Sequence, residues 1–246
     1  MGMAPLFPFL LLLLLPAAVS ASPPVALRPG FYSETCPEAE AIARGVLRQA
    51  MAREIRSAAS VMRLQFHDCL VNVITNFPRA DASSLMALFA KFNLSTKDLV
   101  ALSGSHSIGK ARCFSVVFRL YNQSGSGQPD PAIDPQFREE LDELCPQGGD
   151  EEVTGNLDGT PERFDNRYFS DLVEGRGFLN SDQTLFTSRE TREYVRMFSR
   201  DQGEFFRAFV DGMIKLGDLQ SGRPGEIRRD CRVVNDGPLL LTQAKR

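Results

Sequence analysis

The chain has 246 residues, of which 28 are Lys or Arg and 31 are Asp or Glu, so its formal net charge is -3. This balance argues against the basic surface that nucleic-acid binding requires, and an apolar content of 43% argues against disorder. The sequence holds 2 histidines, so we expect no metal site built from several imidazoles, and any imidazole chemistry must use His67 or His106.

The N-terminus has the pattern of a secretory signal peptide. Residues 9–15 form a short apolar run and residues 16–21 are mostly small, which is typical of a signal cleavage site. A membrane span needs about 20 apolar residues, so we predict a signal peptide over residues 1–21 and no membrane span in the mature chain. In a secreted protein, Asn93 and Asn122 head candidate glycosylation sequons, and the 5 cysteines leave at least one thiol without an intramolecular partner.

Apolar residues at helical spacing predict a mostly helical chain. Ser95 is expected to cap one helix, because Asp98 follows at the offset of a capping box. A stretch rich in Gly and Pro over residues 122–135 is expected to be a loop, and alternation typical of strands is scarce. Further helices are predicted over residues 37–57, 58–69, 81–92, 138–144, 164–174 and 189–216.

Two histidine segments carry the chemistry that the sequence offers. In the first, Arg63 and His67 are four residues apart, so a helix would place them on one face with Phe66 beside them. A fixed cation next to an imidazole suits proton transfer and charge stabilisation. In the second, an apolar run ends in small residues around His106, which would let a flat, bulky group approach the ring. Each segment alone also fits a structural helix that holds a part-buried histidine.

Together the two segments resemble the distal and proximal haem signatures of the plant secretory peroxidases (class III, horseradish type). They read A-A-S-V-M-R-L-Q-F-H-D-C over residues 58–69 and D-L-V-A-L-S-G-S-H-S-I-G over residues 98–109. The resemblance continues in family order with F-Y-S-E-T-C-P at 31–37, L-D-G-T-P-E-R-F-D-N-R-Y at 157–168, S-D-Q-T-L at 181–185 and C-R-V-V-N at 231–235. It implies an all-α, haem-peroxidase-like fold for a domain over residues 22–246.

The resemblance also implies a haem b cofactor, hydrogen peroxide as oxidant and small phenolic donors. His106 would be the proximal iron ligand, and Asp182 would accept its other ring N–H. His67 would act as general acid and base toward peroxide, and Arg63 would stabilise the charge that develops as the O–O bond breaks. Phe66 would wall the haem edge.

A proximal calcium site is implied in the same way. Its ligands would be oxygen atoms, which suit a hard cation. They would come from a backbone carbonyl near Arg163 and from Ser107, Asp158, Thr160 and Asp165.

The sequence departs from the family pattern after residue 72. His67 and His106 are 39 residues apart, much closer than in the family, so we infer that a block of the distal domain is deleted at a junction near residues 72–78. Asp68 and Val71 would remain as residual distal calcium ligands, and Pro78 would stand for the substrate-access proline. Of the cysteines, Cys113 and Cys145 keep their family pairing, whereas the family partners of Cys36, Cys69 and Cys231 are lost.

Two functional readings stay open. The first is a secreted, monomeric peroxidase of the cell wall or apoplast, with the vacuole as the alternative destination. The second is a catalytically impaired or inactive splice variant or remnant of such an enzyme. A zinc or cysteine hydrolase using His67 and Cys69 is the least favoured reading, because such a nucleophile needs an organised base and a group that orients it.

Overall fold

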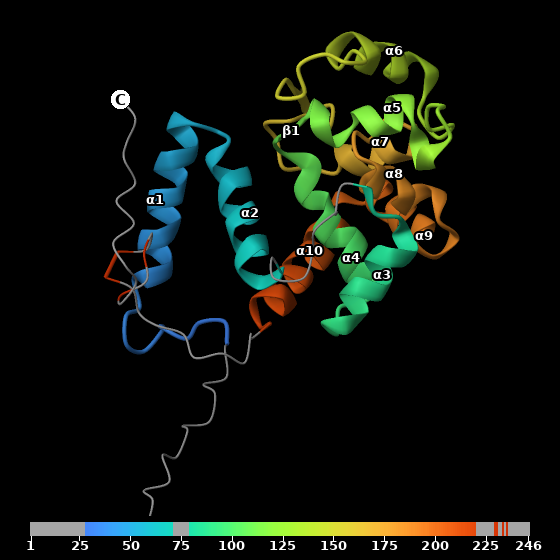
Figure 1. Cartoon of the computed structure of the whole chain (residues 1–246). Coiled ribbons are helices and arrows are strands. Elements are labelled where there is room, and N and C mark those ends of the chain that lie inside the picture. The colour runs from blue at the N-terminus through green and yellow to red at the C-terminus, as the bar shows by residue number, and fades with distance from the viewer. Residues whose placement is uncertain (1–27, 71–78, 220–228, 231–232, 234, 236–246) are drawn as a thin grey trace, which may run out of the picture.

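The computed structural model of the chain describes residues 28–70, 79–219, 229–230, 233 and 235, with the side chains of residues 67–70 excepted. Helices dominate this part of the chain, which confirms the prediction of a mostly helical fold (Figure 1). The α-helices are α1 (Ala39–Arg53), α2 (Ser57–Leu70), α3 (Ala82–Lys91), α4 (Thr96–Ser103), α5 (Val117–Tyr121), α6 (Pro135–Leu144), α7 (Arg167–Val173), α8 (Asn180–Thr187), α9 (Arg189–Arg200) and α10 (Gln202–Gly217). The shorter elements are the 3₁₀ helices η3 (Gly104–Ser107), η4 (Cys113–Ser115) and η5 (Gln123–Gly125) and the antiparallel strands β1 (Lys110–Arg112) and β2 (Thr154–Asn156).

Side-chain caps fix where several helices begin. Ser95 and Asp98 form the predicted capping box of α4, in which each side chain accepts the backbone N–H of the other. Asp81 caps α3 by accepting a first-turn N–H at 2.7 Å. α6 begins at Pro135, earlier than the predicted residue 138, because Asp134 caps it and Pro suits the first turn of a helix.

The single long helix predicted over residues 189–216 is wrong, because the structure divides it into α9 and α10. Asp201 lies between them with an extended backbone (φ -130°, ψ 95°), and its side chain accepts the N–H of Glu204 at 2.8 Å. A short acidic side chain that bonds to the backbone competes with continuation of the helix. α7 is also shorter than the predicted 164–174, and the sequence did not predict α5, α8 or the two strands.

The main core lies between α4 and the helices α7, α9 and α10. Residues 99–101 of α4 are fully buried. The rings of Phe169 and Phe205 meet edge to face with their centroids 4.8 Å apart. At the start of α4, the buried carboxylate of Asp98 pairs with Lys215 of α10 at 2.8 Å. These contacts hold the end of α4, which leads into η3, in a well-packed position.

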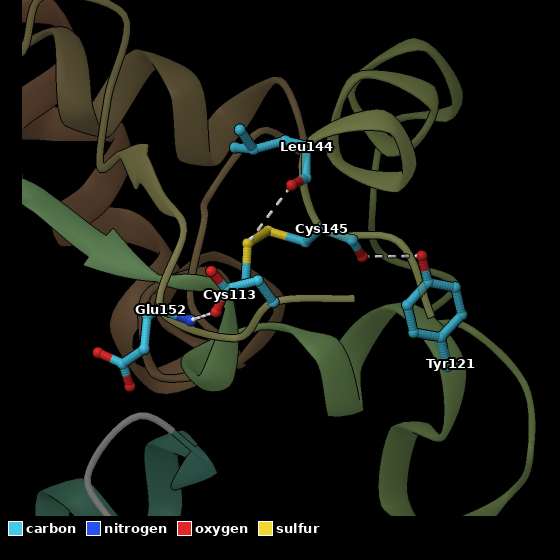
Figure 2. The surroundings of a disulfide bond; sticks show 6 residues. Cys113, Tyr121, Leu144, Cys145 and Glu152 are labelled. Carbon is cyan, nitrogen blue, oxygen red and sulfur yellow. Dashed lines mark hydrogen bonds between the residues drawn. A yellow bond between two sulfur atoms is a disulfide. The ribbon is translucent and has the colours of Figure 1, made fainter. Parts of the chain in front are cut away.

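A second core cluster surrounds a disulfide between Cys113 and Cys145 (Figure 2). Their Cα atoms are 5.4 Å apart, so the pairing that the family resemblance implied is confirmed. The hydroxyl of Tyr121 donates to the carbonyl oxygen of Cys145 at 2.9 Å. Cys36 is a free, exposed thiol.

α1 and α2 form a hairpin at one side of this helical body (Figure 1). α2 contacts α10, and its Met62 and Phe66 are half-buried against the main core. In contrast, no residue of α1 is buried. Within the described residues, none of the helices has the length and apolarity that crossing a membrane requires.

Candidate active site

His106 lies in η3, the short turn that follows α4. Because residues 99–101 of α4 are fully buried, the histidine is attached to a firmly packed part of the core. Gly104 lets two aromatic rings pack closely against the chain just before His106, since a Cβ at this position would overlap the rings of Phe205 and Phe169. The imidazole itself is 29% exposed, so one edge of the ring faces away from the core.

His106 and Asp182 form a polar pair at the centre of the site. Nδ1 of His106 lies 2.8 Å from Oδ1 of Asp182, whose side chain is 2% exposed. Tyr168 of α7 donates its hydroxyl to the same oxygen at 3.0 Å. The other carboxylate oxygen, Oδ2, is buried and has no hydrogen-bond partner among the described residues. Asp182 lies in the first turn of α8, where the helix N-terminus favours a negative charge.

Burial and charge set the protonation of these groups. Burial disfavours the imidazolium, but the charge and hydrogen bond of Asp182 outweigh it, so the pKa of His106 is raised. The cation of Arg63 on α2 acts in the opposite sense and lowers the pKa of His106. Burial, together with the Asp182 charge, raises the pKa of Tyr168 well above its ordinary value. The tyrosine hydroxyl therefore stays protonated and remains a donor to the carboxylate.

The pair leaves Nε2 of His106 available to a ligand. Asp182 engages Nδ1, and no described residue forms a hydrogen bond with Nε2. A metal-bound histidine usually donates its second ring N–H to a carboxylate or a carbonyl, which fixes the tautomer and the ring orientation. The donor set at His106 therefore fits the proximal ligation of haem iron.

Oxygen atoms gather next to His106, between the buried Ser107 and the loop before α7. The hydroxyl of Ser107 donates toward the carbonyl oxygens of Asp165 at 2.8 Å and Arg163 at 3.2 Å. Oγ1 of Thr160 lies 3.0 Å from Oδ1 of Asp165 and 3.5 Å from Oδ2 of Asp158. The structure thus brings the expected proximal calcium ligands together. Hydroxyl, carbonyl and carboxylate oxygens of this kind suit calcium.

Buried carboxylates give this cluster an unfavourable negative charge. Burial raises the pKa of Asp158 to about 6, helped by the charges of Asp171 and Asp165 and opposed by a hydrogen bond from the Thr160 N–H. Among the described residues, no three Asp, Glu, His or Cys side chains come together as metal ligands. A cation here would depend on hydroxyl and carbonyl oxygens as well as on carboxylates.

The structure describes only part of the distal half of the expected site. Arg63 is exposed on α2, and Phe66 is half-buried on the same helix. The backbone of His67 and Asp68 continues α2, as the sequence predicts, but their side chains lie outside the described residues. Also outside the described residues are Val71, Pro78, Cys231 and the thiol of Cys69.

The sequence does not single out Tyr168, although this residue ends the stretch L-D-G-T-P-E-R-F-D-N-R-Y. Tyr168 and Asp182 are 14 residues apart, and the packing of α7 against α8 brings them together. Among the apolar residues of α7, a tyrosine is a signal that could have revealed this contact, because a buried hydroxyl usually finds a hydrogen-bond partner.

The sequence of this chain is similar to known proteins over most of its length. The family model described as Peroxidase matches residues 72–201. Peroxidase 17 of Arabidopsis thaliana is 50% identical over 301 residues, which cover 87% of this chain and 92% of the relative. Peroxidase 58 of the same plant is 36% identical over 331 residues, covering 96% and 100%. Peroxidase C2 of Armoracia rusticana is 32% identical over 326 residues, covering 94% and 93%.

Proposed function

Because the chain belongs to the plant class III peroxidase family, we propose that it holds haem b at His106 and oxidises small phenolic donors with hydrogen peroxide. Family membership implies haem as cofactor and hydrogen peroxide as oxidant. The phenolic donors and the roles of individual residues are our proposals. The observation that carries the role of His106 is its hydrogen bond with the buried carboxylate of Asp182, with 2.8 Å between Nδ1 and Oδ1.

On the proximal side, the chain binds and orients the cofactor. Haem, when bound, supplies the redox chemistry. Nε2 of His106 would hold the haem iron, while its Nδ1–H would donate to Asp182 and make the imidazole a stronger electron donor. Tyr168 fixes the carboxylate by donating to the same oxygen.

On the distal side, we assign proton transfer to His67. Its imidazole would accept a proton from one oxygen of hydrogen peroxide and donate it to the other oxygen. Arg63 lies four residues earlier on α2, so it shares a face with His67 and would stabilise negative charge on the leaving oxygen. Phe66 would wall the edge of the cofactor, and Pro78 would line the access path of the donor.

We assign one calcium ion to the cluster beside His106. Its ligands would be the side chains and carbonyls described above: Ser107, Asp158, Thr160, Asp165 and the carbonyl of Arg163. At the distal end, Asp68 and the carbonyl of Val71 would remain as a residual site that lacks most of its ligands. We therefore expect one tightly bound calcium ion per chain.

We infer that the chain lacks a block of the family's distal domain near residues 72–78. In support, the alignment with Peroxidase 17 spans 301 residues but uses about 214 of this chain, so about 87 of its positions have no counterpart here. The competing reading is a catalytically impaired or inactive splice variant or remnant. The specific observation in its favour is that no residue of α1 is buried, as though a covering segment were missing.

Peroxide-driven oxidation of a phenol tests the proposed activity. We would compare the haem-loaded chain with a version that restores the missing block after residue 72. General acid and base catalysis is typically worth about 10²–10⁴-fold, and in the family an Asn from the missing block orients the distal histidine. We therefore expect peroxide consumption by the shorter chain to be slower by up to about that factor, yet faster than with free haem.

Two outcomes of this comparison are decisive. Equal rates in the two proteins would show that the block is not needed to activate His67. A shorter chain no faster than free haem would contradict the proposed activity and support the inactive reading. A His67→Ala variant of the restored version is the control, and it should lose most of the difference between the two proteins.

Members of this family are typically secreted. We propose that residues 1–21 direct this chain into the secretory pathway and are removed, leaving a domain over residues 22–246 in the cell wall or apoplast, with the vacuole as the alternative. Sequencing of the mature N-terminus tests this, and a chain that retains Met1 would contradict it.

A further inference from the structure

The side chain of Arg119, on α5, is fully buried. A guanidinium removed from water needs a counter-charge and acceptors for its N–H groups. Its Nε donates to Oδ2 of Asp130 at 2.7 Å, and the side chain of Asp130 is 9% exposed. Oδ1 of Asp130 accepts the backbone N–H of Ala132 at 2.8 Å, so the acid is fixed in its turn. Asp130 therefore compensates the charge of Arg119 and holds the guanidinium in one place.

A second nitrogen of Arg119 contacts the connection between α7 and α8. Nη1 donates to the carbonyl oxygen of Gly177 and, at 3.4 Å, to that of Phe178. Phe178 lies four residues before Asp182, in the part of the chain that leads into α8. In the described structure, Arg119 forms no hydrogen bond with Asp182 or with His106. Any influence of Arg119 on the placement of these two residues therefore passes through the backbone before α8.

Gln183, which is 2% exposed, holds the same connection from its other side. Its Oε1 accepts the N–H of Gly177 at 3.1 Å, and its Nε2 donates to the carbonyl oxygen of Leu172 at 2.9 Å. A Cβ at Gly177 would lie 2.6 Å from Leu172 and 3.0 Å from Gln183, so the connection has no spare room on that side. Gln183 directly follows Asp182 in α8. A displacement of Gly177 would therefore be passed on to Asp182.

We propose that Arg119 is a positioning residue of the site, whose guanidinium holds Asp182 at hydrogen-bonding distance from His106. The role rests on the proposed function of His106 as the haem ligand. Nδ1 of His106 and Oδ1 of Asp182 are 2.8 Å apart, and a hydrogen bond weakens as its distance and angle depart from their preferred values. A small displacement of α8 is therefore enough to change how strongly the imidazole donates electrons to a metal.

Arg119 also carries a charge that acts on the site without direct contact. Burial lowers the pKa of Arg119, whereas the hydrogen bond and charge of Asp130 and the charge of Asp182 act in the opposite sense. Because this attraction is mutual, the buried cation also stabilises the carboxylate of Asp182. A lysine at position 119, paired with Asp130, would supply the same charge but only one nitrogen, whereas the planar fork of an arginine serves two acceptors at once. Arg119→Lys therefore separates positioning from charge.

Hydrogen exchange of the haem-free chain tests the positioning without the cofactor. Mass spectrometry of its peptides measures how fast the amides of residues 174–183 exchange in deuterated water, and the amides of α4 report global unfolding in the same sample. In Arg119→Lys, the carbonyl oxygens of Gly177 and Phe178 lose a fixed donor. We expect residues 174–183 to exchange about tenfold faster in this variant, the effect of losing one hydrogen bond, while the exchange of α4 is unchanged.

The matched control is Asp130→Asn, which removes the counter-charge and leaves Arg119 in place. The amide oxygen of the new side chain can still accept from Nε, and Nη1 keeps both carbonyl oxygens as acceptors. Loss of a buried charged partner destabilises the whole chain, so the exchange of α4 should accelerate at least as much as that of residues 174–183. A salt bridge that is only structural predicts this same pattern for Arg119→Lys.

Two properties of the haem-loaded chain measure the effect at His106. The stretching frequency between the iron and the histidine nitrogen, recorded by resonance Raman spectroscopy of the reduced chain, rises as the imidazole becomes a stronger electron donor. We expect Arg119→Lys to lower this frequency and to shift the redox equilibrium about tenfold toward the reduced iron, which raises the midpoint potential by about 59 mV. Asp130→Asn should keep both properties close to those of the unmodified chain.

Gly177→Ala displaces the same connection while Arg119 and Asp130 stay unchanged, so it tests the route to the site even if Arg119→Lys does not fold. We expect Gly177→Ala to speed the exchange of residues 174–183 and to lower the iron–histidine frequency. Unchanged exchange and frequency in either variant would overturn the proposal, as would equal changes in Arg119→Lys and Asp130→Asn. A chain that binds no haem would refute the proposed function instead, while the exchange rates would still decide whether Arg119 positions the start of α8.

Discussion

Tyr168→Phe removes one of the two groups that contact Oδ1 of Asp182 and leaves the aromatic ring in place. The lost hydroxyl lies 3.0 Å from Oδ1, while Oδ2 has no partner among the described residues. After the substitution, His106 is the remaining group on that carboxylate in the described structure. The carboxylate should then attract the Nδ1 proton more strongly and make the imidazole a more electron-rich ligand.

The expected size of this effect follows from the hydrogen bond that is lost. A hydrogen bond to a charged group contributes about 1.5–3 kcal/mol. We take about 1 kcal/mol of this free energy to strengthen the hydrogen bond between His106 and Asp182 and so to stabilise the oxidised iron relative to the reduced iron. The midpoint potential then falls by roughly 40 mV, because 1.4 kcal/mol corresponds to about 59 mV for one electron. The free energy of unfolding should also fall by about 1–3 kcal/mol, because a buried charged oxygen loses a donor.

A redox titration of the haem-loaded chain measures this shift. The control is Tyr121→Phe, which loses a hydrogen bond of 2.9 Å to the Cys145 carbonyl but does not involve Asp182. We expect the control to retain the midpoint potential of the unmodified protein. A Tyr168→Phe protein with an unchanged or higher potential would refute the inference that this tyrosine acts through Asp182 on His106.

Asp158→Asn should abolish calcium binding at the proximal cluster. Calcium affinity of the unmodified chain should fall as the pH drops through about 6, because protons then compete for Asp158, and calorimetric titration at two pH values measures both effects. Replacing Cys113 and Cys145 by Ala should lower the free energy of unfolding by about 3–4 kcal/mol in urea, given their separation of 32 residues. Asp98→Asn should lower it by about 1–3 kcal/mol, because Lys215 loses a buried charged partner. Burial raises the pKa of Asp98, but its hydrogen bonds and the charge of Lys215 lower this pKa on balance. The contribution of ionised Asp98 to the free energy of unfolding should therefore be fully present above pH 3.8, the ordinary pKa of an aspartate, and should disappear as the pH falls through the folded-state pKa.

Three outcomes would contradict the assignments behind these expectations. Two tightly bound calcium ions per chain would contradict the loss of the distal site. Mass mapping that joins Cys113 to a cysteine other than Cys145 would contradict the disulfide. If the Asp98→Asn variant and the unmodified chain differed equally in stability at pH 6 and pH 2, the contribution of the ionised carboxylate would be refuted.

Helix starts could be predicted from the sequence where a local signal stood alone. Ser95 and Asp98 give α4 its capping box, and the sequence identifies both. Asp201 and Glu204 have the same spacing, but they fall inside a long run of apolar residues at helical intervals, which predicts one helix instead of two. The local cap overrides the periodicity because its carboxylate satisfies a backbone N–H that the first turn of α10 leaves unpaired.

The environment of the site depends on contacts that no local pattern carries. The residues around Asp182 by themselves predict an acidic side chain in a surface loop. The family resemblance alone indicated the role of Asp182 at the site. In the structure it is buried in the first turn of α8, and its contact with Tyr168 arises from the packing of α7 against α8. Similarly, the sequence predicts α1 as a helix with apolar positions, but not that these positions remain exposed.

The central claim is that His106 is the ligand through which this chain holds haem. The most direct measurement is a haem titration of the purified chain, followed by its Soret absorption, with His106→Ala titrated in parallel. We predict a Soret band that saturates at one haem per chain in the unmodified protein and is absent from the variant. An equal band in His106→Ala, or no band in the unmodified chain, would contradict the claim.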